Sequence, residues 1–323
     1  MTMKKEKIKT FLTSESAIVL VLVALCIIVT IITPIFATGK NIMSVLQRTA
    51  TTGIVAVGMT FVIGTGGIDL SVGGQVTFIG IVCALCFTAG LPMGLIFLIM
   101  FAIGIGLGAI NGILIASLKL PAIMVTLALQ LITFGFSLYI TEGRQFLIKD
   151  ERFKFFGLGS ILNIPTSIWI FALVAVIGAL LLKKFIIGRK ILAVGSNAKG
   201  AWYSGINVVR TTIVAYIIAG ITCAVSAIIM SSKLMSASAT VGEGMEMDAI
   251  AAVVIGGTSL TGGNGFIVGT VAGALIIEII TNWMTLQNIN PYLRNVVKGV
   301  IIILALLFDN IRRGRLLKNE MAD

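Results

Sequence analysis

The sequence Phe61-Val-Ile-Gly-Thr-Gly-Gly-Ile-Asp-Leu-Ser-Val-Gly-Gly-Gln75 interrupts an otherwise apolar region of the chain. Apolar runs of membrane length lie on both sides of it, at about residues 44–64 and 70–89. Inside a bilayer every backbone N–H and C=O group needs a partner, so a helix that stops there must border protein or a water-filled cavity. The stretch therefore predicts a membrane protein with interrupted helices.

A second stretch, Val254-Ile-Gly-Gly-Thr-Ser-Leu-Thr-Gly-Gly-Asn-Gly265, repeats this pattern. Both stretches contain Val-Ile-Gly, then Leu-Ser or Leu-Thr, then Gly-Gly. Repeated, glycine-interrupted spans are typical of a transport pathway, and close packing of helices through small residues is the alternative. We favour the pathway and expect it to be lined by Gly66, Gly67, Asp69, Ser71, Gly73, Gly256, Gly257, Thr258, Ser259, Thr261 and Gly262.

The composition indicates that lipid is the solvent for most of the chain. Of the 323 residues, 58% are hydrophobic and 11% are charged, and the mean hydropathy is +1.09, whereas soluble domains have about a quarter charged residues. The chain has no histidine, which argues against hydrolytic chemistry and against a zinc site. Cys83 and Cys86 form a C-x-x-C within an apolar run, which we interpret as helix packing rather than redox chemistry.

A window of about 20 apolar residues predicts ten membrane-spanning helices in an all-α fold. We expect one domain over residues 1–323, with residues 142–166 as the main outer loop and residues 188–210 as a cytoplasmic loop. The predicted spans lie at about 17–33, 44–64, 70–89, 93–118, 121–141, 167–187, 211–232, 248–260, 266–286 and 292–308.

The net charge of +11 follows the pattern of a membrane protein, not of a nucleic-acid-binding one. Lysine and arginine gather where apolar runs stop: near the N-terminus, in residues 183–210 and in residues 312–318. If the number of spans is even, all three groups fall on one side, which predicts that both termini are cytoplasmic. Lys40, Arg48, Arg294 and Lys298 lie on or near the outer side and go against this rule.

Two carboxylates fall within apolar segments, where an ionised group costs at least about 2.5 kcal/mol unless it finds partners or water. Asp69 lies in the first glycine stretch, where it is either a functional residue or, with Ser71, a cap for the next helix. Glu278 lies in a later span and either pairs with a neighbouring helix or contacts a substrate. The sequence leaves both questions open.

The cytoplasmic loop contains the signature of a short helix. Ser196 or Asn197 is a suitable N-cap, residues 198–204 form about two turns, and Gly205 suits a left-handed C-terminal cap. Trp202 and Tyr203 would be exposed on it, where they either insert into a groove on a partner protein or anchor the helix at lipid headgroups.

Together these motifs resemble the permease subunit of bacterial ATP-binding-cassette importers, in the ribose and monosaccharide branch of the branched-chain amino acid/ribose permease superfamily. The resemblance runs along nearly the whole chain, in the order of the family. It rests on Ala56-Val-Gly-Met-Thr60, Gly67-Ile-Asp-Leu-Ser-Val-Gly73, Pro121, Thr126-Leu127, Gly188-Arg189, Gly195, Asn197, Ser204-Gly-Ile-Asn207, Asp248-Ala-Ile-Ala-Ala-Val-Val254, Gly256-Gly-Thr-Ser-Leu260, Gly262-Gly263 and Asp309-Asn310.

The resemblance implies a type II-like permease of about ten helices in the bacterial cytoplasmic membrane, paired with a second copy or a paralogue. A separate ATPase subunit would bind ATP and Mg²⁺, and the chain itself, which lacks a G-x-x-x-x-G-K-[ST] loop, would be no enzyme and hold no cofactor. A sugar-loaded binding protein would meet the outer loops, where Arg144 and Arg152 are candidates to pair with its acidic residues. The residues expected to couple to the ATPase are Gly188, Arg189, Gly195, Asn197, Ala201, Trp202, Ser204 and Gly205.

Three other functions compete with this interpretation. A secondary transporter would couple solute movement to ions through Asp69 or Glu278. A membrane enzyme is disfavoured because the chain offers no convincing pair of nucleophile and base. A permease of the same family could carry a nucleoside or a sugar-derived signal molecule, since similarity of fold does not identify cargo.

Overall fold

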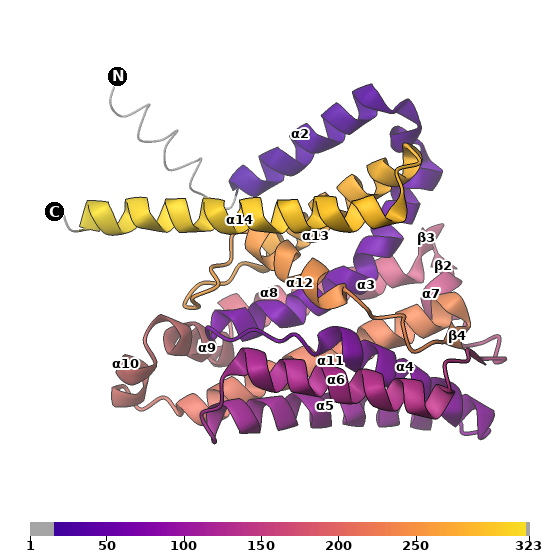
Figure 1. Cartoon of the computed structure of the whole chain (residues 1–323), viewed down its shortest axis with the longest axis horizontal. Coiled ribbons are helices and arrows are strands. Elements are labelled where there is room, and N and C mark those ends of the chain that lie inside the picture. The colour runs from indigo at the N-terminus through magenta and orange to yellow at the C-terminus, as the bar shows by residue number, and fades with distance from the viewer. Residues whose placement is uncertain (1–15, 321–323) are drawn as a thin grey trace.

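The computed structural model describes residues 16–320, which form mainly helices (Figure 1). The helices are α2 (Ser16–Ile32), η1 (Pro34–Ala37), α3 (Gly39–Gly64), α4 (Val72–Thr88), α5 (Met93–Ala116), α6 (Ala122–Thr141), α7 (Phe155–Leu158), α8 (Thr166–Lys183), α9 (Ile186–Ser196), α10 (Ala198–Tyr203), α11 (Val208–Leu234), α12 (Met245–Ile255), α13 (Ile267–Leu286) and α14 (Pro291–Glu320). Four two-residue strands accompany them: β1 (Phe146–Leu147), β2 (Ser160–Ile161), β3 (Ile164–Pro165) and β4 (Ser236–Ala237).

Six helices of the described chain are long and apolar enough to cross a membrane, namely α3, α5, α6, α8, α11 and α13. Helices α2 and α4 are apolar but shorter. Large apolar side chains cover much of the outer surface, and Leu131 in the middle of α6 is 71% exposed. Because so much exposed apolar surface suits hydrocarbon rather than water, the prediction of a helical, multi-pass membrane protein is confirmed.

The helices follow the predicted spans in position, with three differences. Helix α3 begins at Gly39, so that Lys40 and Arg48 lie within it. Helix α12 has only 11 residues, too few to cross a bilayer alone. Helix α9 is a separate element where the sequence predicted only part of a connection. The lysines at residues 4–9, on which the predicted orientation partly rests, lie outside the described residues, as do the side chains of residues 312–318.

The core forms where α11 packs along α5 and α3 (Figure 1). Small residues let α11 approach α5 closely: a side chain at Gly104 would overlap the carbonyl of Gly220, and one at Gly112 would meet the Cα of Ile213 at 2.6 Å. Between helices in a membrane this close backbone approach supplies the packing that burial of apolar surface supplies in water.

The outer loop predicted over residues 142–166 is folded against the helix ends. Strand β1 pairs antiparallel with β4, which joins the loop to the end of α11. The rings of Phe87, Phe97, Phe153 and Phe156 form one cluster, with the Phe97 and Phe156 centroids 5.1 Å apart and edge to face. The Ser232 hydroxyl donates to the Phe153 carbonyl and accepts from the backbone N–H of Gly157. The loop thus shares the core of its neighbours instead of having its own.

Different secondary-structure elements lie at the two ends of the molecule. Helices α9 and α10 lie at one end, and α7 with the strands β2, β3 and β4 lies at the opposite end (Figure 1). The loops after α3 and after α12 belong to the α9 end, because the backbone N–H of Gly263 donates to the Gly64 carbonyl and a side chain at Gly195 would overlap both groups. The fold therefore places both glycine stretches next to the predicted cytoplasmic helix.

Candidate functional site

The first glycine stretch forms a break over residues 65–71 between α3 and α4. Helix α3 ends where Gly66 takes a φ of +84°, a left-handed conformation that glycine adopts without strain. The Tyr216 ring covers the turn, since a side chain at Gly67 would lie 2.6 Å from its hydroxyl. At the start of α4, Gly73 packs against the backbone carbonyl of Gly242. The break is closely packed on both sides.

Asp69 is the centre of a buried polar network at this break. Its Oδ1 accepts from the backbone N–H of Ser71 at 2.9 Å and from the Ser71 hydroxyl at 2.5 Å. The same hydroxyl accepts from Gln75 Nε2 at 2.8 Å and from Asn111 Nδ2 at 2.9 Å. All four side chains are fully buried. Asp69 therefore holds the turn by accepting a backbone N–H, and its Oδ2 has no hydrogen-bond partner among the described residues.

Gln75 and Asn111 were missed by sequence reasoning. Each is an amide inside an apolar helix, α4 and α5 respectively. Polar side chains at membrane depth are costly and usually face the interior of a helix bundle. That signal was present in the sequence, and searching the spans for amides as well as for carboxylates would have found both residues.

The second glycine stretch forms a break over residues 256–266 between α12 and α13. Gly256 packs against the backbone of Gly269. The buried Thr258 hydroxyl accepts a hydrogen bond from the backbone N–H of Phe266 at 3.2 Å. Ser259 and Thr261 bring their hydroxyls within 3.3 Å of each other. Three glycines of this break, Gly257, Gly262 and Gly263, have φ of +88°, +81° and +77°.

The two breaks and the end of α9 meet in what we call the glycine junction, formed by Gly64, Gly66, Gly195, Gly262 and Gly263. Gly263 donates its N–H to the Gly64 carbonyl at 3.1 Å. A side chain at Gly262 would lie 2.6 Å from the backbone nitrogen of Gly66, and one at Gly195 would overlap the Gly64 carbonyl. From the sequence we predicted that Gly195 takes part in coupling and that both glycine breaks line the pathway. The structure brings Gly195 into backbone contact with the ends of both breaks.

Helix α10 follows directly and has the predicted caps. The Asn197 side chain accepts from the Gly200 N–H at 2.9 Å as N-cap, and Gly205 takes a φ of +79° after the helix. Trp202 and Tyr203 are 64% and 80% exposed, and their rings meet edge to face with centroids 5.0 Å apart. The short helix thus presents an aromatic pair to its surroundings.

The remaining residues of the predicted coupling group support α10 and its approach. Ala201 is buried beneath α10, and the Ser204 hydroxyl donates to the Gly200 carbonyl at 3.0 Å. Gly188 packs against the carbonyls of the last turn of α8, whereas Arg189 is exposed. These contacts close the last turn of α10 and hold the start of α9 against the end of α8.

The two arginines of the loop over residues 142–166, which was predicted to be the outer loop, differ in their surroundings. Arg152 makes a two-pronged contact with Asp150, with Nε to Oδ1 at 3.1 Å and Nη2 to Oδ2 at 2.8 Å. These hydrogen bonds hold the pKa of the Asp150 carboxyl below its usual value. Arg144 lies 3.9 Å from Glu142 and its side chain is 83% exposed. Arg144 is therefore the freer of the two charges.

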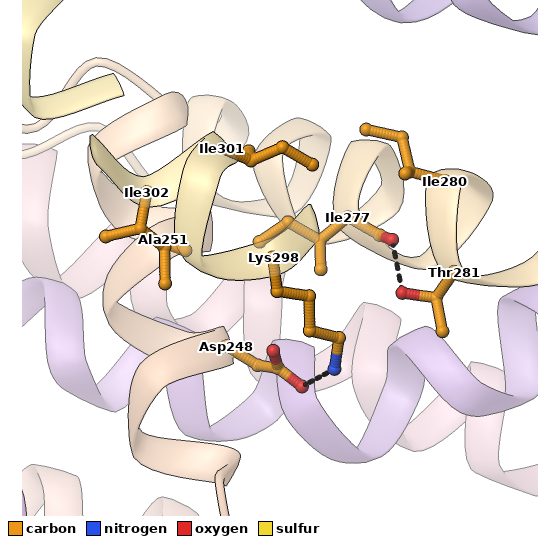
Figure 2. A pocket seen from close by; sticks show the side chains of 8 residues that line it. All are labelled: Asp248, Ala251, Ile277, Ile280, Thr281, Lys298, Ile301 and Ile302. Atoms are coloured by element: carbon orange, nitrogen blue, oxygen red, sulfur yellow. Dashed lines mark hydrogen bonds and ion pairs between the residues drawn. The ribbon is translucent and has the colours of Figure 1, made fainter. Parts of the chain in front are cut away.

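A second charged group lies away from both breaks, among α3, α12, α13 and α14. The Lys298 ammonium donates to Asp248 Oδ2 at 2.8 Å (Figure 2), and Arg48 Nε lies 3.9 Å from Glu278 Oε1. Glu278, for which the sequence left two interpretations open, thus has a cation on a neighbouring helix. Lys298 and Arg48 are two of the residues that go against the charge rule, and each has a carboxylate partner inside the protein.

Comparison of the sequence with known proteins places the chain in a family. Residues 41–306 match the family described as branched-chain amino acid transport system / permease component. The ribose import permease protein RbsC of Bacillus subtilis is 42% identical over 88% of this chain and 89% of its own length, and that of Haemophilus influenzae is 39% identical over 90% and 91%. The L-arabinose transport system permease protein AraH of Escherichia coli is 34% identical over 93% and 91%. No solved structure matches the chain.

The match covers both glycine breaks, the junction, α10 and the outer loop in one continuous range. The family matches most of the chain, and relatives above 30% identity align over 88–90% of it and 89–91% of their own length, which is enough to assign the family. The chain belongs to the branched-chain amino acid transport system / permease component family of membrane permeases, in the branch that contains the ribose and arabinose import permeases.

Proposed function

We propose that the chain is the membrane permease subunit of an ATP-driven importer that carries a ribose-like monosaccharide across the bacterial cytoplasmic membrane. The observation that carries the proposal is the glycine junction, where both breaks and the end of α9 are in backbone contact. The cargo class is taken from the relatives, whose names specify ribose at 42% and 39% identity and L-arabinose at 34%.

Energy would come from a separate ATPase subunit that docks on α10. The exposed Trp202 and Tyr203 rings supply the kind of aromatic anchor that dominates protein interfaces. Ala201 is buried under them and ties α10 to the body of the protein. A partner that grips the aromatic pair would therefore move α10 as a unit.

Motion of α10 would reach the pathway through the glycine junction. A contact of backbone against backbone contains no flexible side chain that could absorb a displacement, so a shift of Gly195 must move the Gly64 and Gly263 peptides as well. ATP binding would favour one arrangement of the junction because the ATPase contacts α10 differently in its two states. In the arrangement described here the two breaks are in backbone contact at the α9 end.

On the opposite side, a sugar-binding protein would meet the loop formed by β1, α7 and β4. The pathway residues carry hydroxyls and backbone carbonyls, which suit weak and transient contact with a neutral sugar, and affinity would reside in the binding protein. We further propose ten membrane passes, cytoplasmic termini and a second permease copy or a paralogue beside this chain. The permease itself would require no metal or cofactor.

The test is purification of the tagged permease from its host in detergent, with identification of bound proteins and an ATPase assay with D-ribose and L-arabinose. We expect a cassette ATPase and a solute-binding protein to co-purify and one of the sugars to stimulate hydrolysis. A chain that comes down alone and moves solute into liposomes without ATP would instead be a secondary transporter.

A further inference from the structure

The chain between β4 and α12, residues 238–244, has neither helix nor strand. Strand β4 lies at the end of the molecule that carries α7, whereas α12 lies further inside, between that end and the α9 end (Figure 1). A helix of 11 residues is about 16 Å long, roughly half of a hydrocarbon core of about 30 Å. Residues 238–255 therefore form what we call the re-entrant element, a non-helical segment that enters the membrane and continues as a half-length helix.

Contacts with α4 set the depth of this element. The backbone N–H of Gly242 donates to the Thr77 hydroxyl at 2.9 Å, and a side chain at Gly73 would overlap the Gly242 carbonyl. Thr77 and Gly73 precede the end of α4 at Thr88 by 11 and 15 residues, or about 17 and 23 Å at a rise of 1.5 Å per residue. Since α4 ends at the turn that joins it to α5, Gly242 lies well inside a hydrocarbon core of about 30 Å.

Helix α5 gives the same depth independently. The Ser71 hydroxyl, just before α4, accepts from the side chain of Asn111 in α5. Asn111 follows the start of α5 at Met93 by 18 residues, about 27 Å, and Ser71 precedes the end of α4 by 17 residues, about 26 Å. The two helices therefore run together from their common turn, and distance along α4 measures depth in the membrane.

One face of the re-entrant element is exposed at this depth. Thr240, Glu243 and Met247 are exposed and follow one another at intervals of three and four residues. No ion pair joins the Glu243 carboxylate to any described residue. Glu246, by contrast, is buried, and its carboxylate lies against Gly73. The protein thus covers one side of the element and leaves the Glu243 side open.

Hydrocarbon chains cannot cover the open side. Ionisable side chains at membrane depth face the interior of a helix bundle or a water-filled cavity, and non-helical backbone there must be buried in protein or line such a cavity. Helix α4 covers the backbone of Gly242, but nothing in the described chain covers Glu243. Helices that begin inside the membrane are also typical of transport pathways. The open side therefore needs water.

We infer that the exposed face of the re-entrant element, formed by Thr240, Glu243 and Met247, lines a water-filled stretch of the translocation pathway inside the membrane. The inference rests on the proposed function for its choice of a sugar pathway, although the access of water does not depend on it. The Glu243 carboxylate and the Thr240 hydroxyl can accept hydrogen bonds from the hydroxyls of a passing sugar. The face thus extends the predicted pathway beyond the two glycine breaks.

The first experiment measures water access to this face. The complete importer, with the four cysteines of the permease replaced, is placed in proteoliposomes that hold a membrane-impermeant cationic thiol reagent on both sides, with and without ATP. Labelling of Glu243→Cys and of Thr240→Cys is followed by mass spectrometry. The control is Leu131→Cys, in the middle of α6 and 71% exposed. We expect both variants to react at least about tenfold faster than the control, because a charged reagent enters hydrocarbon poorly.

The second experiment asks whether the sugar passes along this face. D-ribose uptake into the same proteoliposomes is measured before and after the reagent adds its bulky charged group. We expect Glu243→Cys to transport before treatment and to lose uptake after it, because the added group occupies the pathway. The matched control is Ala89→Cys, exposed in the turn between α4 and α5, which should react and keep its uptake.

The outcomes separate this inference from the proposed function. If neither Glu243→Cys nor Thr240→Cys reacts faster than Leu131→Cys, the water-filled stretch is wrong, and oxidation that then links two permeases through Glu243→Cys would identify a dry contact between copies. If both react but modification leaves D-ribose uptake unchanged, the face lies off the pathway and the importer still stands. If both react but the untreated importer moves no monosaccharide, the face is confirmed as water-lined and the sugar importer is wrong.

Discussion

The two glycine breaks share a sequence pattern but are held in different ways. At the first break the Asp69 carboxylate gathers Ser71, Gln75 and Asn111 into a fully buried network. At the second break the loop itself carries no charged residue and is shaped by three glycines with positive φ and one buried threonine, with the Lys183 ammonium 4.9 Å from the centre of the Phe266 ring. The first break is fixed by side chains, and the second largely by its backbone.

This difference indicates which break moves. A buried network of charge-assisted hydrogen bonds resists rearrangement because each broken bond leaves a polar group unpaired in a medium of low dielectric. Residues 256–266 contain no carboxylate around which such a network could form, and a single hydrogen bond joins the buried Thr258 hydroxyl to the backbone of Phe266. We therefore expect the second break to change its internal conformation more than the first during transport.

The largest effect should come from separating the breaks at the junction with Gly195→Leu. The new side chain would overlap the Gly64 carbonyl and the Gly263 nitrogen, so we expect loss of D-ribose uptake and a decrease in stability of at least about 1–3 kcal/mol from overpacking. Uptake and thermal unfolding measure the two effects. Gly135→Ala, where a methyl group meets nothing within 4 Å, is the control, and normal uptake by Gly195→Leu would remove the junction from the mechanism.

The next prediction compares the breaks directly. Asp69→Ala leaves the Ser71 N–H and hydroxyl without their acceptor, so we expect a loss of about 1–3 kcal/mol in unfolding free energy. Thr258→Val removes one hydrogen bond to Phe266 at the second break, for about 0.5–1.5 kcal/mol. Denaturant unfolding in detergent measures both. Equal losses would mean that the two breaks are held alike. Asp69→Asn should keep uptake, whereas a secondary transporter that uses this carboxylate would lose it.

A third prediction concerns how the second break is driven. Trp202→Asp should abolish sugar-stimulated ATP hydrolysis, because it places a charge in the aromatic contact that we propose with the ATPase. As a surface substitution it should change stability by no more than about 0.5 kcal/mol. Stimulated and basal hydrolysis of the reconstituted importer separate coupling from folding. Tyr139→Asp, on the exposed surface of α6, controls for a new charge at an aromatic position. Stimulation that survives Trp202→Asp would place the docking surface elsewhere.

The smallest effect is expected at the end of the molecule opposite both breaks. Arg144→Glu should slow D-ribose uptake at low sugar concentration, since exposed charges at an interface act mainly on the association rate. Arg152→Glu should have a weaker effect, because Asp150 already neutralises Arg152. Uptake at several salt concentrations tests this order. Equal rates for both variants and the unchanged chain would remove these arginines from the binding-protein interface.

The helices were predictable because apolar length is a local property of the sequence. The N-cap at Asn197 and the left-handed Gly205 were also local, and both are confirmed. Helix α9 was missed because its basic residues resemble those of a loop at the membrane surface. The glycine junction was beyond reach, since Gly64, Gly195 and Gly263 meet only after eight intervening helices have packed.

Site residues show the same limit. Asp69 was found from its charge, whereas its partners Gln75 and Asn111 carry none and escaped notice. Arg48 and Lys298 looked like exceptions to the charge rule, and only the fold reveals that Glu278 and Asp248 face them. A residue that contradicts a sequence rule was in both cases the sign of a partner far along the chain.

The pairing of β1 with β4 has a consequence for folding during synthesis of the protein. The Gln145 side chain donates a hydrogen bond to the Ser236 hydroxyl, which is 91 residues further along the chain. The pairing of β1 with β4 therefore cannot form until the ribosome has made the whole of α11. Until then the backbone of Phe153 and Gly157 lacks the hydrogen bonds of the Ser232 hydroxyl. A nascent chain that stalls before residue 237 should therefore be cut in this loop by an added protease more readily than the finished chain is.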